Sequence, residues 1–281
     1  MTLEPLPLAL VLLAALMHAG WNLIAKTGDD RLVAMAIMKV PNMAVALGII
    51  AWAGLPAPES WPYLLASWVV NCTYFYFLIK AYRGDLSLAY PVARGLAPLI
   101  VLAISAVVAR EIPTPLGLAG VTLISAAIFA LAWRRDASKH HYATLMWACG
   151  VGLAIAIYTV IDGLGVRRGG NAMGYVATLS FLTGVVVCAV AYAKRGRAVT
   201  VAVRKHWKHG LAGGTLMLLG YTIVVHAMTL APMAQISALR ESSVIFAAIL
   251  GVIFLKEPFG ARRIVASAVV AAGILLLALG R

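Results

Sequence analysis

Two arginines lie inside long apolar stretches, where a charged side chain requires a physical reason. Arg94 follows the residues YPVA, Arg240 follows ISAL, and 146 positions separate the two. A charge deep in a membrane span costs at least about 2.5–3.5 kcal/mol on the insertion scale, so it should face a polar cavity or a partner. We expect both guanidinium groups to bind an anionic group of a substrate. Snorkelling to the nearer interface, or locking helices through carbonyl hydrogen bonds, is the open alternative for both.

The stretch around Arg94 also contains two prolines. Pro91 and Pro98 lie on either side of the arginine. Each lacks an N–H and clashes with the preceding turn, so this helix should be kinked and should leave free carbonyl groups beside the arginine. Broken helices of this kind surround transport sites. An ordinary tolerated kink is the alternative.

The stretch around Arg240 differs from its counterpart. It has no matching proline, and Glu241 stands where the first stretch has Gly95. Ser243 lies three residues after Arg240, so the two should share a sector of the helix. We expect Arg240 and Ser243 to bind substrate and Glu241 to take part in ion coupling.

A polar face precedes these stretches near the N-terminus. His18, Trp21 and Asn22 are spaced i, i+3, i+4, which places them on one face of a helix. Trp21 and Asn22 are therefore expected to bind substrate, and His18 to carry a coupling proton.

A second such face contains the carboxyl group of Asp162. Tyr158 and Asp162 are spaced i, i+4 in the helix expected over residues 143–166. An intramembrane carboxylate needs a partner, which Arg240 or Lys39 could supply. We expect Tyr158 to bind substrate and Asp162 to couple ion movement. An interfacial position near the outer end of the span is the alternative for Asp162, as snorkelling is for Lys39.

Aromatic residues complete the candidate site. Tyr74 and Tyr221 are near the middle of their spans and are expected to form cavity walls. Tyr90 begins a span and could equally belong to an interfacial belt of aromatic residues. His226 is close to the outer end of its span, where a structural role competes with ion coupling.

The elements that must position these residues are membrane spans. The chain has 281 residues, of which 63% are hydrophobic and 12% charged, and its mean hydropathy is +0.94. A soluble domain is about 45–50% apolar and about 25% charged. Because a span needs about 20 apolar residues, ten spans use up the chain. The expected fold is an all-α integral membrane protein, with spans at about 5–26, 32–54, 62–83, 87–109, 113–133, 143–166, 173–193, 207–230, 233–255 and 259–279.

The distribution of basic residues predicts the orientation. The turns after spans 1, 3, 5, 7 and 9 hold sixteen of the 23 Lys and Arg residues, and the opposite turns hold four. By the positive-inside rule the first side is cytoplasmic, so both termini face outward, across the plasma (inner) membrane. The net charge of +13 is explained by these flanking residues, and nucleic acid is not expected as a partner.

A weak internal repeat relates the two halves of the chain. At the offset of 146, Ala81 falls on Ala227, Arg94 on Arg240 and Glu111 on Glu257. Five spans in each half force the second half to cross the membrane with opposite polarity. We therefore expect two inverted five-helix repeats, residues 1–136 and 137–281. This arrangement is typical of secondary transporters, whose substrate sites lie near the midplane between the repeats.

Signatures of enzymes and pumps are absent from the sequence. It contains neither a GxxxxGK[ST] phosphate loop nor an HExxH zinc motif. No catalytic residue, metal site or cofactor is expected.

Three strings make the chain resemble a known family. They are HAGWNLIAK at 18–26, YPVARGLAPLIVL at 90–102 and ESSVIFAAILGVIFLKEPF at 241–259. With ten short-looped spans in two halves, they resemble EamA-type members of the drug/metabolite transporter superfamily. The resemblance implies a secondary carrier for small polar metabolites, often an exporter of amino acids, with a cavity between the halves. It leaves the substrate open.

Several functional alternatives remain at this point. An uptake carrier of the same fold, a membrane-embedded enzyme and a passive channel compete with export. The expected partners are a small-molecule substrate, membrane lipid and possible counter-transported protons, in a monomer or a dimer.

Overall fold

The computed structural model describes residues 4–25, 30–81, 86–132, 139–255 and 261–280, and helices make up nearly all of them. The elements in chain order are α1 (Pro5–Ala25), α2 (Arg31–Ala53), the short 3₁₀ helix η1 (Pro58–Ser60), α3 (Trp61–Ala81), α4 (Leu86–Val108), α5 (Pro115–Ala132), α6 (Lys139–Gly169), α7 (Ala172–Arg195), α8 (Arg197–Ala227), α9 (Met233–Arg240), α10 (Ser243–Leu255) and α11 (Ala261–Leu279). No strand occurs within these ranges.

These helices match the ten predicted spans. Eight segments are long and apolar enough to cross a membrane, with α9 and α10 together counting as one. Two shorter apolar helices, Pro115–Leu131 and Ile264–Leu279, supply the others. In hydrocarbon, every backbone N–H and C=O must be satisfied within the segment, which is why such apolar runs fold as helices. The prediction of an all-α membrane protein is confirmed.

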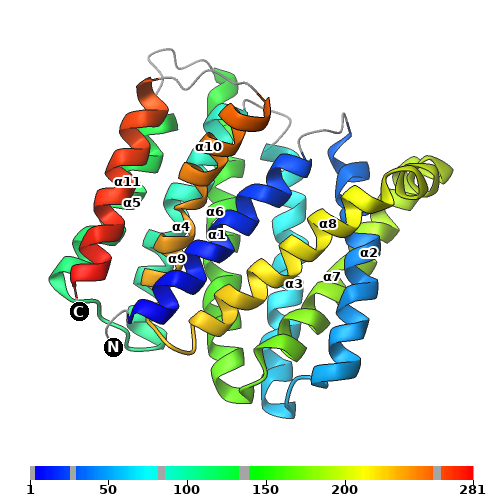
Figure 1. The fold of residues 1–281 in the computed structure, drawn as a ribbon, viewed down its shortest axis with the longest axis horizontal. Helices are drawn as coiled ribbons and strands as arrows, with labels where there is room; N and C mark the ends of the chain where they lie inside the picture. The colour runs from blue at the N-terminus through cyan, green and yellow to red at the C-terminus, as the bar shows by residue number, and fades with distance from the viewer. Residues whose placement is uncertain (1–3, 26–29, 82–85, 133–138, 256–260, 281) are drawn as a thin grey trace.

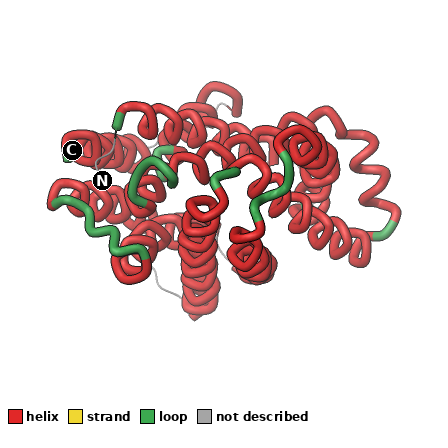
Figure 2. Tube along the Cα trace, turned by 90° about the horizontal axis from the view of Figure 1, so that it is seen from below, coloured by secondary structure: helices red, strands yellow, loops and turns green. Residues whose placement is uncertain are grey.

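The helices cross the bundle in alternating directions. In Figure 1, α1 begins and α11 ends at the lower side, whereas α3 and α10 end at the upper side. Helix α4 begins at that upper side and descends, so it runs opposite to α9 and α10, its counterparts in the second half. Figure 2, seen from below, shows the helices gathered around the interior of the bundle. The antiparallel relation agrees with an inverted repeat.

Packing between helices follows the same symmetry. Helix α1 packs against α8, α9 and α10, and its counterpart α6 packs against α3 and α4. Helices α2 and α7, which correspond to each other, are in contact, as are α5 and α11. The last pair approaches closely at Gly120 and Gly273, where a Cβ on Gly120 would lie 2.9 Å from the Gly273 carbonyl oxygen. The small residues of these two helices therefore pack them together, away from the interior of the bundle.

The backbone interruption lies in span 9, whereas span 4, in which the prolines predicted a kink, is one continuous helix. Helix α4 is continuous through Pro91 and Pro98. In span 9 the amides of Glu241 and Ser242 donate to Ala238 and Leu239, 3.0 Å each, in place of the usual partners four residues back. Such tightening in the middle of a span often marks a functional hinge. Neighbouring helices can satisfy the carbonyls freed by proline, so proline alone does not determine where a span breaks.

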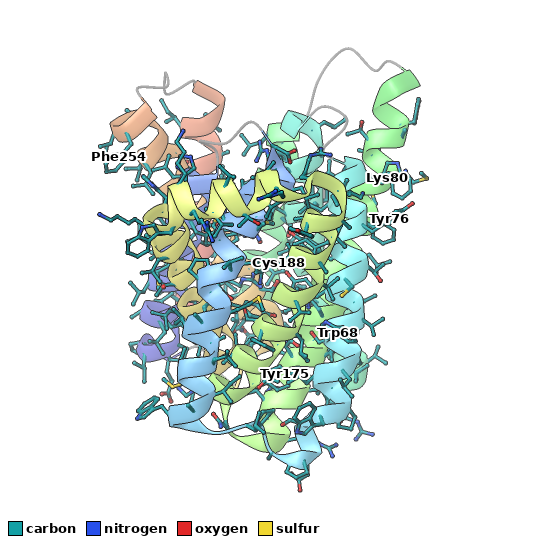
Figure 3. All side chains as sticks on the ribbon, turned by 90° about the vertical axis from the view of Figure 1, so that its right-hand side faces the viewer. Trp68, Tyr76, Lys80, Tyr175, Cys188 and Phe254 are labelled. Carbon is teal, nitrogen blue, oxygen red and sulfur yellow. The ribbon has the colours of Figure 1, made fainter. Side chains whose placement is uncertain are left out.

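The predicted polar connection at 194–205 is mostly helical, which corrects that prediction. Helix α8 begins at Arg197 and bends at His206, where φ is −114° and ψ is 21°. Its first part crosses the upper end of the bundle rather than running along it (Figures 1 and 3). Three valines lie there between basic residues at both ends of the segment, a composition that also occurs in helices of the membrane interface. The polar composition of this stretch therefore did not reveal that it is helical.

Large apolar side chains cover the outside of the bundle. Trp52, Val107, Ile112 and Phe254 are each at least two-thirds exposed (79%, 79%, 85% and 66%). Phe254 and Tyr76 point outward in Figure 3, whereas Tyr175 lies among the helices. Because a soluble protein rarely exposes so much apolar surface, this exterior is suited to lipid.

Candidate functional site

A cavity of about 180 Å³ lies in the interior of the bundle, lined by helices from both halves. Its walls come from α1, α2, α3 and α4 in the first half and from α6, α7, α8 and α9 in the second. The lining reaches Ala81 and Ala89, at the ends of α3 and α4 on the upper side of Figure 1. The cavity is thus placed where an inverted repeat should bind substrate.

Nine of the thirteen predicted site residues line this cavity. They belong to six helices that are distant in sequence: His18, Trp21, Asn22, Tyr74, Tyr90, Arg94, Tyr158, Tyr221 and Arg240. Ser243, Glu241, Asp162 and His226 are not among the lining residues. The first three contact lining residues from behind, whereas the exposed His226 side chain lies at the surface near the end of α8. His226 therefore lies apart from the cavity, because the rotation of α8 turns its side chain outward.

Arg94 is neutralised by the opposite half. Its Nε donates to Oε2 of Glu241 at 2.9 Å, and its Nη2 donates to Oγ of Ser243 at 3.3 Å. The two charged side chains are only 7% and 3% exposed. Both partners belong to the interrupted part of span 9, so this buried pair joins α4 to the hinge between α9 and α10.

Arg240 has a different environment, although it occupies the equivalent position. Its guanidinium carbon lies 5.5 Å from the centre of the Tyr221 ring, and the Tyr158 side chain lies near it in the same cavity. Among the residues that the structure describes, no carboxylate lies within ion-pair distance of it. It is nevertheless 9% exposed. Arg240 is therefore a buried cation that faces the cavity without a carboxylate in ion-pair contact among the described residues, although Glu241 and Asp162 lie near enough to interact with its charge.

The two arginines come from opposite halves of the chain and meet at one cavity. Arg94 bonds to Glu241, the residue next to Arg240, and both arginines line the cavity. Their side chains therefore belong to one site.

Asp162 lies behind the cavity wall with its charge held by hydroxyl groups. Tyr175 donates to Oδ1 at 2.9 Å, and Tyr221 donates a short hydrogen bond to Oδ2. The Ser67 hydroxyl is a further partner. Neither Arg240 nor Lys39 pairs with this carboxylate, which corrects the expected partner. Asp162 is also 0% exposed, so its carboxylate is enclosed by protein.

Sequence reasoning missed two groups of polar residues. Ser67 and Tyr175 lie near Asp162. Their helices, α3 and α7, carry charged residues only near their ends. Ser180 and Thr183 line the cavity from α7. With Val176 they follow the spacing i, i+4, i+7, which indicates one helix face and could have been recognised. Ser67 and Tyr175 could not, because only helix packing brings them to Asp162.

The lower half of the bundle is closed by a second charged cluster. Nη1 of Arg167, at the end of α6, lies 2.6 Å from Oε1 of Glu111, and the other carboxylate oxygen accepts from the Met233 amide at 2.8 Å. Arg167 also donates to the carbonyls of Met228 (2.7 Å) and Ala231 (3.2 Å) after α8. This lower cluster ties the end of the first half to the start of α9. Glu257, the repeat counterpart of Glu111, lies outside the described residues.

Comparisons with known proteins agree with this arrangement. The model of the EamA-like transporter family matches residues 143–279. A solved structure described only as the crystal structure of a protein has a TM-score of 0.77 over 97% of this chain and 96% of its own, at 17% identity. That similarity concerns the fold alone. None of the curated proteins matches the chain. Residues 143–279 therefore form an EamA-like transporter family domain, and the chain is a multi-pass integral membrane protein with the fold of that transporter family.

Proposed function

We propose that the protein is a secondary carrier that exports amino acids or similar small carboxylate-bearing metabolites by alternating access. Arg240 carries this proposal, because it is a buried cation that lines the cavity without a carboxylate partner among the described residues. A substrate carboxylate would supply the missing charge through two parallel N–H···O bonds. Trp21 and Tyr74, in the same cavity, would contact the apolar part of the substrate.

Residues 1–136 and 137–281 would act as the two moving units. The mirrored packing of α1 and α6 supports this division, since each contacts helices of the other half in the same way. The Arg94–Glu241 pair and the lower cluster both cross between the units. Exchange between inward-open and outward-open states then requires these contacts to rearrange while the binding residues stay central.

The upper side of Figure 1 is proposed to be cytoplasmic. The ends of α3 and α10 lie on this side, and in the sequence they precede turns that are rich in Lys and Arg. The cavity reaches this side at Ala81 and Ala89, while Glu111 and Arg167 are bonded at the other. This conformation would be the inward-open state of an exporter in the plasma (inner) membrane, ready to load substrate from the cytoplasm.

Asp162 is the proposed proton-coupling group. Tyr221 donates to its carboxylate, and the same ring contacts Arg240. A change in the charge of Asp162 would therefore affect the substrate-binding arginine through the Tyr221 side chain, which contacts both. His18 and Glu241 are weaker candidates, since the first only lines the cavity and the second is committed to Arg94.

Counterflow in proteoliposomes tests the proposal. Unlabelled amino acid inside the vesicles should accelerate entry of labelled amino acid, and protonophores should alter net transport but not exchange. Asp162→Asn should retain exchange while losing proton-driven accumulation. Flux that never saturates would indicate a channel, chemically altered substrate would indicate an enzyme, and no acceleration by any small carboxylate would contradict the proposal.

The direction and orientation need separate measurements. A C-terminal fluorescent tag that folds only in the cytoplasm should remain dark. Cells that overproduce the protein should release the substrate faster than cells with an Arg240→Ala variant at equal abundance. Faster accumulation in the cells would instead identify an uptake carrier.

A further inference from the structure

Lys39 is a second buried cation in the same cavity. It lies on α2, it is 6% exposed, and it lines the cavity together with Ser180 and Thr183 of α7. Its Nζ donates to Oγ of Ser180 at 3.4 Å. The proposed function gives no role to this lysine, because the arginine and the aromatic residues account for one carboxylate and an apolar part.

The polar groups around Lys39 can accept a hydrogen bond from its ammonium group, but they carry no negative charge that would neutralise it. The Ser180 hydroxyl donates to Oδ1 of Asn42 at 2.8 Å, and the Asn42 amide donates to the Gly214 carbonyl at 2.8 Å. Ser180 therefore has only lone pairs left for the ammonium. The Thr183 hydroxyl donates to the Leu179 carbonyl at 2.7 Å, within its own helix.

The countercharge of Lys39 is missing from its surroundings. Among the described residues no carboxylate lies within ion-pair distance of Nζ. The one titratable neighbour is the Cys188 thiol, which Figure 3 places in the interior above Tyr175. An ammonium has three donors, and one is used. A buried charge without a partner is strongly unfavourable, so its two remaining donors are suited to a ligand that brings a negative charge.

Lys39 and Arg240 occupy different parts of the cavity. Arg240 lies over Tyr221, whose hydroxyl shares Asp162 with Tyr175 of α7. Lys39 contacts the same helix at Ser180, five residues further along, which is about 7.5 Å of helical rise. A ligand contacting both cations must therefore carry two separated anionic groups.

We propose that the Lys39 ammonium, positioned by its hydrogen bond to Ser180, forms a second anion subsite, and that the preferred substrate is a short dicarboxylate such as an acidic amino acid. This inference rests on the proposed function, since it extends the substrate bound by Arg240. One carboxylate binds the Arg240 guanidinium, and the other binds the Lys39 ammonium. Tyrosine and tryptophan rings between the two subsites contact the carbon chain.

A matched pair of substrates tests the subsite directly. Glutamate and glutamine have the same shape and differ by one charge, so the counterflow rate with each isolates the second carboxylate. We expect wild-type protein to prefer glutamate at least tenfold in half-saturating concentration. Lys39→Met should lose that preference by weakening glutamate while leaving glutamine unchanged, and Lys39→Arg should retain it.

Two controls keep the outcome decisive. Lys205→Met removes an exposed lysine of α8 and should leave the preference intact. The thermal stability of Lys39→Met should equal or exceed that of wild type, because an uncompensated charge is removed. Equal use of glutamate and glutamine by wild-type protein would overturn the subsite alone, even if a variant failed to fold. No counterflow with any carboxylate would overturn both the subsite and the proposed function.

Discussion

Arg94 and Arg240 occupy equivalent positions in the two halves of the protein, yet only one is neutralised. Arg94 is bonded to Glu241 and Ser243, whereas Arg240 faces the cavity beside two tyrosines. A single position explains the difference. Glu241 follows Arg240 in the second half, and its counterpart after Arg94 is Gly95. The second half therefore supplies the carboxylate that pairs with Arg94, whereas no described carboxylate of the first half pairs with Arg240.

The local packing preserves this asymmetry. A Cβ at Gly95 would lie 3.2 Å from the Ser125 carbonyl oxygen and from the Phe129 ring, so a side chain there is crowded. Glu241 instead lies at the interruption of span 9, from which its side chain reaches Arg94 of α4. In an inverted repeat, one arginine has thus become part of the framework while the other remains available for substrate.

The largest expected effect is on folding, through Arg94. Arg94→Met should lower the free energy of unfolding by about 3–5 kcal/mol, because it leaves the Glu241 carboxylate buried without a partner. Chemical denaturation in detergent measures this loss. The double variant Arg94→Met with Glu241→Met should recover most of it, since it removes both charges together. A single variant as stable as wild type would show that the buried pair contributes nothing to the framework.

Arg240 should behave in the opposite way. Arg240→Met should weaken substrate binding by about 2–5 kcal/mol, which is roughly 30-fold or more in half-saturating concentration. Its free energy of unfolding should stay within about 1 kcal/mol of wild type, because no buried carboxylate loses a partner. Counterflow rates and denaturation of one preparation separate the two effects. Unchanged transport with reduced stability would assign Arg240 to the framework as well.

Tyr221 contacts both the buried Asp162 carboxylate and the substrate-binding Arg240. Its substitution should therefore have intermediate effects on stability and on substrate binding. Tyr221→Phe keeps the ring beside Arg240 but removes a hydrogen bond to the Asp162 carboxylate, which should cost about 1.5–3 kcal/mol of stability. Half-saturating substrate concentration should change less than in Arg240→Met. Tyr175→Phe is the matched control, because it removes the other tyrosine hydrogen bond from Asp162 without touching Arg240. A larger substrate effect from Tyr175→Phe would contradict this division.

An exposed ion pair provides the smallest effect. Nε of Arg195 lies 2.6 Å from Oδ2 of Asp30, and the side chains are 50% and 34% exposed. Arg195→Met should therefore cost less than about 1 kcal/mol. This pair lowers the pKa of the Asp30 carboxyl below its ordinary value of 3.8 through the hydrogen bond from Arg195. Its contribution is complete above that ordinary value and is lost as pH falls through the lower native pKa.

Thermal unfolding across pH measures that dependence. The difference in stability between wild type and Arg195→Met should be constant near neutral pH and should vanish in strong acid. Asp30 also accepts from the amides of Leu32 and Val33 at the start of α2, and this capping does not depend on Arg195. A stability difference that persists when Asp30 is protonated would contradict the assigned cause.

Membrane spans were predictable because they depend on the local sequence. A run of about 20 apolar residues must form a helix in lipid, whatever surrounds it. The alternation of directions follows from the number of spans, as Figure 1 shows for α4, α9 and α10. The interruption after Arg240 was not predictable in this way. Proline is a local signal, but a break also depends on whether neighbouring helices satisfy the freed backbone groups.

Candidate cavity residues were predictable where the side chain was unusual for a membrane span. Arg94, Arg240, Trp21 and Tyr158 stood out against apolar neighbours, and all four line the cavity. Ser180 did not stand out, since serine is common in such helices. His226 stood out but faces outward, because a residue type does not determine the rotation of its helix.

The sequence by itself determined an all-helical membrane protein, its family resemblance and a set of polar residues that must avoid lipid. Only the tertiary structure decided how those residues are paired. It assigned Glu241 to Arg94, hydroxyl groups to Asp162, and left Arg240 and Lys39 facing the cavity without a carboxylate among the described residues. The physical reason is the distance in sequence over which each effect acts. The hydrophobicity of a span is a property of a few consecutive turns, whereas a countercharge comes from another helix. Whether a buried charge is paired then distinguishes a structural residue from a binding residue.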